Sequence, residues 1–132
     1  MLERRRILIA EDEALIALEL AAAVESAGGE VVGPVASVKE GLQLLDQEDV
    51  DAAILDVRLI DRDAAPIATL LLERGRAIVF HSASPVPAEV VDRFGAPVVC
   101  PKPMPSDLVA THLARLLRRG GVLSLGSEPS QQ

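Results

Sequence analysis

The architecture of this chain is set by one segment, Asp51-Ala52-Ala53-Ile54-Leu55-Asp56-Val57-Arg58-Leu59. An apolar run bounded by polar residues is typical of a strand buried on both faces of a parallel sheet. The run ends in a carboxylate, Asp56, and a buried charge has to be paired, bound to a metal or neutralised. We therefore predict a central strand over 52–56 whose last residue carries chemistry.

Four further apolar runs share this pattern, and segments with helical periodicity separate them. Five strands that alternate with five helices indicate a parallel sheet covered by helices on both faces. Ser37 is expected to cap the second helix, with Glu40 in capping-box position, and Ser106 is expected to cap the last. The predicted strands are 5–10, 30–35, 52–56, 77–81 and 98–100, and the predicted helices are 14–27, 38–47, 64–74, 88–94 and 106–118.

Two prolines predict the order of the strands. Proline cannot donate a hydrogen bond to a neighbouring strand, so the strands that carry Pro34 and Pro101 belong at the edges. The result is an α/β, flavodoxin-like doubly wound (βα)5 fold whose five-stranded parallel sheet has the order 2-1-3-4-5. This domain is predicted over 1–119, and the Gly/Ser-rich segment 120–132 is expected to be a flexible C-terminal tail.

The composition excludes several classes of protein. The chain has 132 residues, 49% hydrophobic residues and a net charge of −7, which indicates one domain with a real core and disfavours direct nucleic-acid binding. With no Trp and no Tyr it lacks the rings of base-stacking modules and flavin pockets. No apolar stretch is long enough to span a membrane. The single cysteine, Cys100, fits a cytoplasmic protein without an internal disulfide.

Polar side chains gather at the carboxyl ends of the predicted strands, where ligands bind in open parallel sheets. Three neighbouring carboxylates repel one another unless a cation joins them, and carboxylate oxygens suit a hard ion such as Mg²⁺. A carboxylate can also accept a phosphoryl group, whose charge an ammonium and a hydroxyl would then share. The residues in question are Glu11 and Asp12 after the first strand, Asp56, Ser82 after the fourth and Lys102 after the fifth.

These pieces, in order, resemble the response-regulator receiver domain of two-component phosphorelay signalling, in its stand-alone, single-domain type. The resemblance covers about residues 5–118. It is carried by Ile-Leu-Ile-Ala-Glu11-Asp12-Glu13, Ala-Ile-Leu-Asp56-Val-Arg-Leu, Val-Phe-His-Ser82-Ala and Lys102-Pro103.

The resemblance implies a phospho-acceptor switch rather than an enzyme. Asp56 would receive a phosphoryl group from a phosphohistidine of a sensor histidine kinase or a histidine phosphotransfer protein. Ser82 and Lys102 would bind the phosphoryl group, and the Lys102–Pro103 bond would be cis. The switch would change affinity for a downstream protein, and the chain would be a monomer or weak homodimer. The implied Mg²⁺ ligands are Glu11, Asp12, Asp56 and the backbone carbonyl of Arg58.

Two departures from the family pattern leave an alternative open. Val99 stands where receivers usually carry an aromatic residue, and the loop over 60–64 has no glycine. The alternative is a degenerate receiver that acts as a phosphorylation-independent protein-binding module. Enzymes on the same fold fit less well: a haloacid-dehalogenase phosphatase would need an Asp in place of Arg58. A flavodoxin would need a phosphate-binding loop in place of the acids at 11–13.

Several polar residues near the strand ends also fit purely structural roles. Asp12 could simply cap the first helix. No chemistry is expected of the other acids near the strand ends, which are interpreted as solvated or capping residues. His81 is expected to be a satisfied strand-end histidine, and Cys100 inert core. The acids without expected chemistry are Glu13, Asp61 and Asp63.

Overall fold

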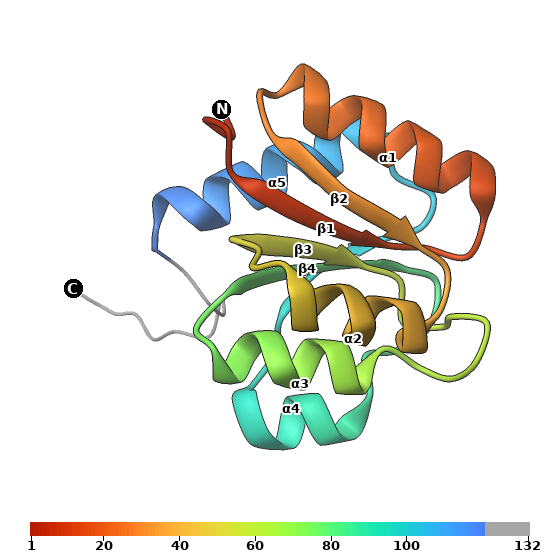
Figure 1. The fold of residues 1–132 in the computed structure, drawn as a ribbon. Helices are drawn as coiled ribbons and strands as arrows, with labels where there is room; N and C mark the ends of the chain where they lie inside the picture. The colour runs from red at the N-terminus through yellow and green to blue at the C-terminus, as the bar shows by residue number, and fades with distance from the viewer. Residues whose placement is uncertain (121–132) are drawn as a thin grey trace.

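The computed structural model describes residues 1–120 and contains five strands and five helices in strict alternation within that range (Figure 1). The predicted tail over 120–132 lies, apart from Gly120, outside the described residues. The predicted elements are all found, with ends that differ by one residue at most. The strands are β1 (Arg6–Ala10), β2 (Glu30–Val35), β3 (Ala52–Leu55), β4 (Ala77–Ser82) and β5 (Val98–Pro101), and the helices are α1 (Ala14–Ser26), α2 (Val38–Gln47), α3 (Ala65–Glu73), α4 (Ala88–Phe94) and α5 (Ser106–Arg118).

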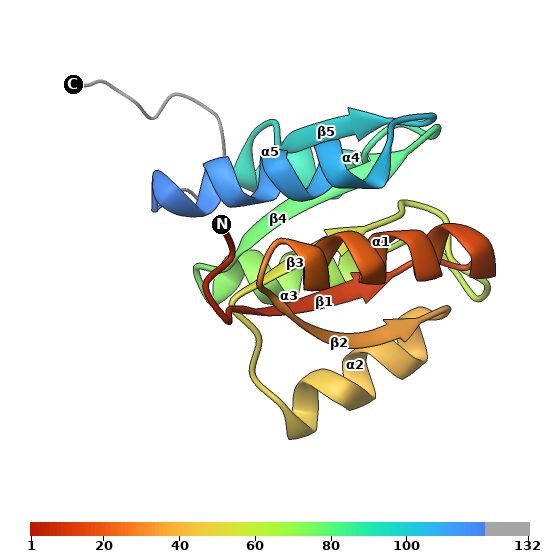
Figure 2. The same cartoon turned by 90° about the horizontal axis from the view of Figure 1, so that it is seen from above.

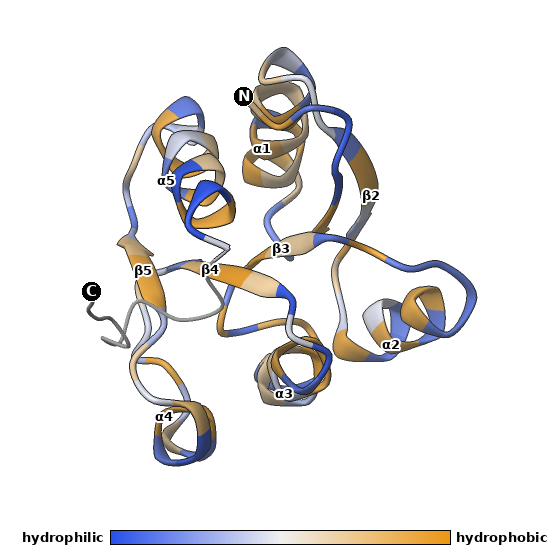
Figure 3. Ribbon diagram, turned by 90° about the vertical axis from the view of Figure 1, so that its left-hand side faces the viewer, coloured by the Kyte–Doolittle hydropathy of each residue, from blue (hydrophilic) through white to orange (hydrophobic). Residues whose placement is uncertain are grey.

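The five strands form one parallel sheet in the order β2-β1-β3-β4-β5, which confirms the predicted flavodoxin-like order. Helices α1 and α5 pack side by side on one face, and α2, α3 and α4 cover the other (Figures 1 and 2). Seen along the strands in Figure 3, the sheet separates these two helical layers. The fold is therefore a doubly wound α/β sandwich with a core on each side of the sheet.

Both prolines that predicted the edge strands lie in edge strands. Pro34 stands in β2 at an irregularity, because the pairing with β1 shifts between Leu8 and Ala10. Pro101 ends β5, where its Cα is paired with that of Ser82 on β4. Proline has no backbone N–H to donate. Because both prolines lie in edge strands, they interrupt no hydrogen bond between the central strands.

The three central strands are almost entirely inaccessible to solvent. Every residue of β3 and β4 is buried, and β1 is buried from Ile7 onward. Side chains alternate between the two cores: Ile7 and Ile9 face α1 and α5, whereas Leu8 and Ala10 face α2 and α3. Since these strands run in parallel, their carboxyl ends meet at one edge of the sheet and fix the positions of the residues that follow them.

The predicted caps were right for one helix and wrong for another. The Oγ of Ser37 accepts the backbone N–H of Glu40 at 3.0 Å, which confirms the cap of α2. Ser106 instead is the first residue of α5 and makes no capping hydrogen bond. The carbonyl of Pro105 accepts the N–H groups of Leu108 and Val109, so Pro105 takes the cap position. Asp12 does not cap α1 either, because that helix has Glu13 at its N-cap and no side-chain cap.

Hydrogen bonds connect the loop between β3 and α3 to the start of α2. The carboxylate of Asp61 accepts the N–H groups of Val38 and Lys39, and the N–H of Ile60 donates to the carbonyl of Ala36. Asp63 accepts the N–H of Ala65 at the start of α3. Of the two interpretations given for these aspartates, solvated or capping, Asp61 has the capping role. Helix α3 has Ala64 at its N-cap and no side-chain cap, so Asp63 is not its cap. None of the helices in the described part of the chain is long and apolar enough to cross a membrane.

Candidate functional site

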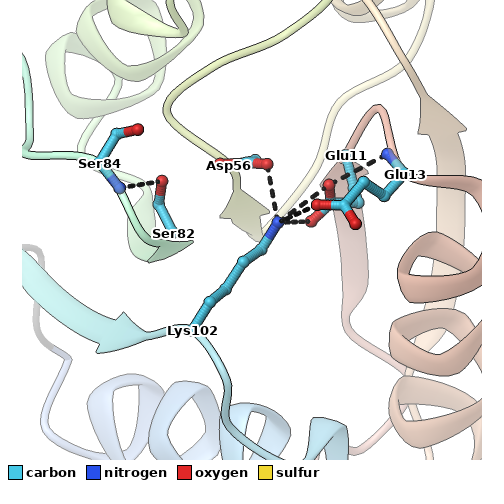
Figure 4. A network of polar contacts seen from close by, with 6 residues as sticks. All are labelled: Glu11, Glu13, Asp56, Ser82, Ser84 and Lys102. Carbon is cyan, nitrogen blue, oxygen red and sulfur yellow. Dashed lines mark hydrogen bonds and ion pairs between the residues drawn. The ribbon is translucent and has the colours of Figure 1, made fainter.

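Four of the predicted site residues lie at the carboxyl ends of four different strands. Glu11, Asp56 and Lys102 meet there, whereas the hydroxyl of Ser82 lies beside them and contacts Ser84 (Figure 4). Glu11 and Asp56 directly follow β1 and β3, and both are buried, with 2% and 6% of their surface exposed. Ser82 ends β4 and is buried as well. Lys102 follows β5, and only 13% of its side chain is exposed. The site thus holds three charged groups in a largely water-free position.

Lys102 is the centre of this arrangement. Its Nζ lies 2.9 Å from Asp56 Oδ2, 3.0 Å from Glu11 Oε1 and 3.2 Å from Glu13 Oε2. In Figure 4 the lysine reaches between the carboxylates of Asp56 and the two glutamates. The Lys102–Pro103 peptide bond is cis, as the resemblance implied. One ammonium therefore neutralises part of the charge of three acids.

Glu13 is the member of this cluster that the sequence did not reveal. It was expected to have no chemical role, yet its carboxylate contacts the ammonium of Lys102. The run of three consecutive acids at 11–13 could have indicated this role of Glu13. A residue that follows Glu11 and Asp12 still lies close to the carboxyl edge of the sheet. The backbone N–H of Glu13 also donates to Glu11 Oε2 at 3.1 Å, which fixes the rotamer of Glu11.

Burial and the lysine shift the pKa values of the two buried acids in opposite directions. Burial, only partly offset by Lys102, raises the pKa of Glu11 to about 7, and the charge of Asp56 adds to the rise. Burial also opposes the charge of Asp56, but hydrogen bonds from Lys102 and Ser82 outweigh it and lower the pKa of Asp56. Burial alone would lower the pKa of Lys102, but its bonds to Asp56 and Glu11 raise it above the ordinary value. Near neutral pH, Asp56 is thus a carboxylate next to a permanently charged ammonium.

The acids at this edge form a group that suits a hard cation. One carboxylate oxygen each from Glu11, Asp12 and Asp56 lies within 4.8 Å of the others. Glu11 Oε1 is buried and accepts no hydrogen bond from the described residues, although it lies close to Lys102 Nζ. An all-oxygen donor set with several carboxylates fits Mg²⁺. These residues could hold the ion, whereas a ligand role for the carbonyl of Arg58 stays a prediction.

A pocket of about 240 Å³ opens beside Asp56. Its wall includes Asp56 and Lys102 together with Arg58, which is exposed, and Ser84. The N–H of Ser84 donates to Ser82 Oγ at 3.1 Å, so this hydroxyl is oriented by its own loop (Figure 4). The pocket admits a group of modest size to a nucleophilic carboxylate, with a hydroxyl and an ammonium beside it.

Two neighbouring residues differ from expectation or from the usual pattern. His81 was expected to be a satisfied histidine, but it is 3% exposed and neither ring nitrogen has a hydrogen-bond partner among residues 1–120. It lines a hollow whose wall also includes Ile16, Met104 and the charged Lys102. Val99 is 44% exposed on the edge strand β5. Cys100 is buried as expected, and burial raises the pKa of its thiol.

Comparison with known proteins identifies the fold family. No protein-family model matches the chain. The solution structure of SdrG from Sphingomonas melonis Fr1 matches 89% of this chain and 99% of its own, with 37% identity and a TM-score of 0.71. A response regulator receiver protein from Sinorhizobium medicae WSM419 matches 91% of this chain and 99% of its own, with 26% identity and a TM-score of 0.75. The chain belongs to the CheY-like response-regulator receiver domains.

The receiver is also similar to a part of a curated protein. It shares 40% identity over 65 residues with the transcriptional regulatory protein PdtaR of Mycobacterium tuberculosis. The match covers 49% of the receiver and 32% of that protein, so the receiver matches about a third of the length of this relative. Receiver domains are phospho-acceptor switches of phosphorelay signalling that bind Mg²⁺ at an acidic site. Membership of this family supports a role in phosphorelay signalling.

Proposed function

We propose that Asp56 accepts a phosphoryl group from a phosphohistidine of a sensor histidine kinase or a histidine phosphotransfer protein. A carboxylate oxygen of Asp56 forms the new P–O bond while the P–N bond to the donor imidazole breaks and its electron pair returns to nitrogen. The observation that carries this proposal is the 2.9 Å contact between Asp56 Oδ2 and Lys102 Nζ at a buried strand end. It supports a nucleophile that is charged, accessible from one side and held in place.

Each polar neighbour has a role in this reaction. The lowered pKa of Asp56 keeps its carboxylate deprotonated and able to attack. Lys102 and Ser82 stabilise charge on the phosphoryl oxygens as the transfer proceeds. When bound, Mg²⁺ supplies further neutralisation of that charge, and Glu11, Asp12 and Asp56 would hold it. Arg58 would add its backbone carbonyl to these ligands.

Phosphorylation changes the affinity of the receiver for a downstream protein. The added charge on Asp56 draws Ser82 and Lys102 toward the phosphoryl oxygens and shifts an equilibrium between two conformations. The reaction turns over only slowly without a partner, so the receiver is a switch rather than an enzyme. We also propose that the protein is a stand-alone receiver. It is located in the cytoplasm and is a monomer or a weak homodimer.

The test is phosphorylation by a small donor. Acetyl phosphate with Mg²⁺ should add about 80 Da, the mass of one phosphoryl group, and the gain should vanish without Mg²⁺. Asp56→Asn should remove the gain, whereas Asp92→Asn, on the exposed surface of α4, should retain it. A mass gain that survives in Asp56→Asn, or no gain in the unmodified sequence, would contradict the proposal.

Val99 favours one alternative. The exposed, small side chain of Val99 cannot act as the aromatic switch of the usual receiver. A degenerate receiver would bind its partner in the same way whether or not Asp56 is modified. Equal partner affinity for the unmodified protein, its phosphorylated form and Asp56→Asn would support this alternative. Mg²⁺-dependent phosphorylation with a change of affinity would exclude it.

A further inference from the structure

A second hollow, of about 340 Å³, lies beside the acceptor pocket on the face of the sheet that α1 and α5 cover. Its walls come from α1 with the residue before it, from β4 and from the segment that joins β5 to α5. Glu13 and Lys102 line both this hollow and the acceptor pocket, so the two share a wall. We name it the His81 cleft, and its other wall residues include Ile16, Glu19, His81, Pro103 and Met104.

His81 gives the cleft an unsatisfied polar group. His81 is 3% exposed, and neither Nδ1 nor Nε2 has a hydrogen-bond partner among the described residues. Burial lowers the pKa of His81, and the positive charge of Lys102 lowers it further. A neutral imidazole offers one N–H donor and one lone pair. Buried polar groups are rarely left without partners, so a ligand that supplies one is expected here.

The remaining lining of the cleft combines apolar surface with an unused negative charge. Ile16, Pro103 and Met104 contribute the apolar walls. The carboxylate of Glu19 is exposed and makes no hydrogen bond or ion pair within residues 1–120. The ammonium of Lys102 adds little net positive charge, because three carboxylates already surround it.

This combination selects a cation with an aliphatic stem and several N–H donors. An acidic ligand would be repelled by Glu13 and Glu19, and an apolar ligand would leave His81 unsatisfied. A guanidinium can donate to a carboxylate and to an imidazole nitrogen at once, because its five N–H groups point in fixed directions, whereas an ammonium is a compact point charge. We propose that the His81 cleft binds an arginine side chain of a partner protein, with its stem on Ile16 and Met104 and its guanidinium between Glu19 and His81.

The wall shared with the acceptor pocket connects this site to phosphorylation. When Asp56 carries a phosphoryl group, Lys102 pairs with the phosphoryl oxygens and gives up part of its contact with Glu13. The cleft then becomes more negative and holds the guanidinium more tightly. By linkage, an arginine in the cleft favours the phosphorylated state to the same degree. This regulation rests on the proposed phosphorylation of Asp56, whereas the binding site itself does not.

The probe for the site is N-acetyl-arginine N-methylamide, added to the full ¹⁵N-labelled chain without phosphorylation. Saturable shifts of the His81 ring nitrogens are expected, and the norleucine analogue, which keeps the stem and lacks the guanidinium, should cause none. Glu19→Gln should weaken binding about threefold, the size of one solvent-exposed ion pair. Glu25→Gln, elsewhere on α1, should leave binding unchanged.

A second variant separates binding from folding. His81→Leu keeps the buried site apolar, so the protein should fold, and it should lose most of the arginine binding. The proposal is overturned if the arginine probe leaves the His81 nitrogens unshifted. It is also overturned if Glu19→Gln and Glu25→Gln bind the probe equally well.

Repeating the titration after treatment with acetyl phosphate and Mg²⁺ tests the regulation. Affinity for the probe should rise in the unmodified sequence and stay constant in Asp56→Asn. A constant affinity in protein shown by mass to be phosphorylated would overturn the regulation and leave the site intact. If no phosphorylation is seen by mass, the function proposed for Asp56 fails, while the first titration still decides the arginine site.

Discussion

The carboxylate of Asp61 accepts the backbone N–H of Val38 at 2.8 Å, although 23 residues separate the two in the chain. A second oxygen of the same carboxylate accepts the N–H of Lys39 at 3.0 Å. The first turn of α2 is therefore capped twice, by Ser37 from its own chain segment and by Asp61 from the loop that follows β3. Since that loop begins directly after Asp56, these hydrogen bonds connect the segment after Asp56 to α2.

Removing this long-range cap should lower the stability of the receiver. The two N–H bonds lower the pKa of Asp61, so the carboxylate stabilises the fold above its ordinary pKa and this contribution is lost as the pH falls. Asp61→Ala should therefore reduce the thermal midpoint at pH 7 and have a smaller effect in strong acid. Circular dichroism melts against Asp92→Ala, an exposed aspartate of α4, would measure this. Equal midpoints for the two variants would mean that the cap contributes nothing.

Lys102→Gln should destabilise the receiver mainly when Mg²⁺ is absent. The substitution leaves Glu11 and Asp56 buried without a counter-charge, which costs about 3 kcal/mol of unfolding free energy in comparable buried pairs. Added Mg²⁺ should restore part of this loss, because the ion would neutralise the same carboxylates. Urea titrations with and without Mg²⁺ give both values. The matched control is Arg62→Gln, whose ion pair with Asp63 is exposed and should contribute little. A loss that Mg²⁺ leaves unchanged would argue against metal binding here.

The affinity for Mg²⁺ should depend on pH through Glu11. The raised pKa of about 7 means that this carboxyl keeps a proton below neutrality, and the ion has to displace it. Affinity is therefore expected to fall about tenfold for each pH unit below 7 and to level off above it. Calorimetry in two buffers of different ionisation enthalpy would count the released proton. Glu11→Gln should bind more weakly and without this pH dependence. A pH-independent affinity in the unmodified sequence would mean that Glu11 is no ligand.

Gly33 should tolerate alanine far less well than Gly75 does. Both glycines have positive φ angles, +94° and +73°, which cost a side-chain-bearing residue about 1–2 kcal/mol. At Gly33 a Cβ would also lie 2.9 Å from the backbone nitrogen of Val35 and 3.1 Å from the carbonyl of Ile9, whereas nothing lies within 4 Å at Gly75. The difference in unfolding free energy between Gly33→Ala and Gly75→Ala thus isolates the crowding beside β1. Equal losses of unfolding free energy in the two variants would show that the backbone around residue 33 relaxes to accommodate the Cβ.

Most of the fold was predictable because the local sequence patterns agree with the topology of the sheet. The apolar runs that form β1, β3 and β4 are buried on both faces, and the two prolines lie in the edge strands that they predicted. Parallel strands place their carboxyl ends at one edge, so the proximity of Glu11, Asp56, Ser82 and Lys102 also followed from the sequence. The chemical roles of these residues stay predictions.

The missed features depend on contacts that spacing does not encode. Asp61 could be predicted to cap a helix, but not that the helix lies earlier in the chain. Ser106 was wrong as a cap because the N-cap of α5 lies one residue earlier, at Pro105, whose carbonyl accepts the N–H groups of Leu108 and Val109. Glu13 and His81 differ from expectation because the position of Lys102, and of the α1–α5 layer, depends on packing between distant elements. Periodicity predicts which face of a helix or strand a side chain lies on, but not which residues it contacts.

The absence of Trp and Tyr leaves the receiver without a strong intrinsic fluorophore. Phe80 is fully buried on β4, Phe94 is partly buried, and the chain contains no Trp or Tyr. A single tryptophan introduced at the exposed Val99 would therefore be its only strong fluorophore. Its emission would report events at the β5 edge without background, and the same chain could be followed in mixtures with a kinase or partner peptide that lacks tryptophan.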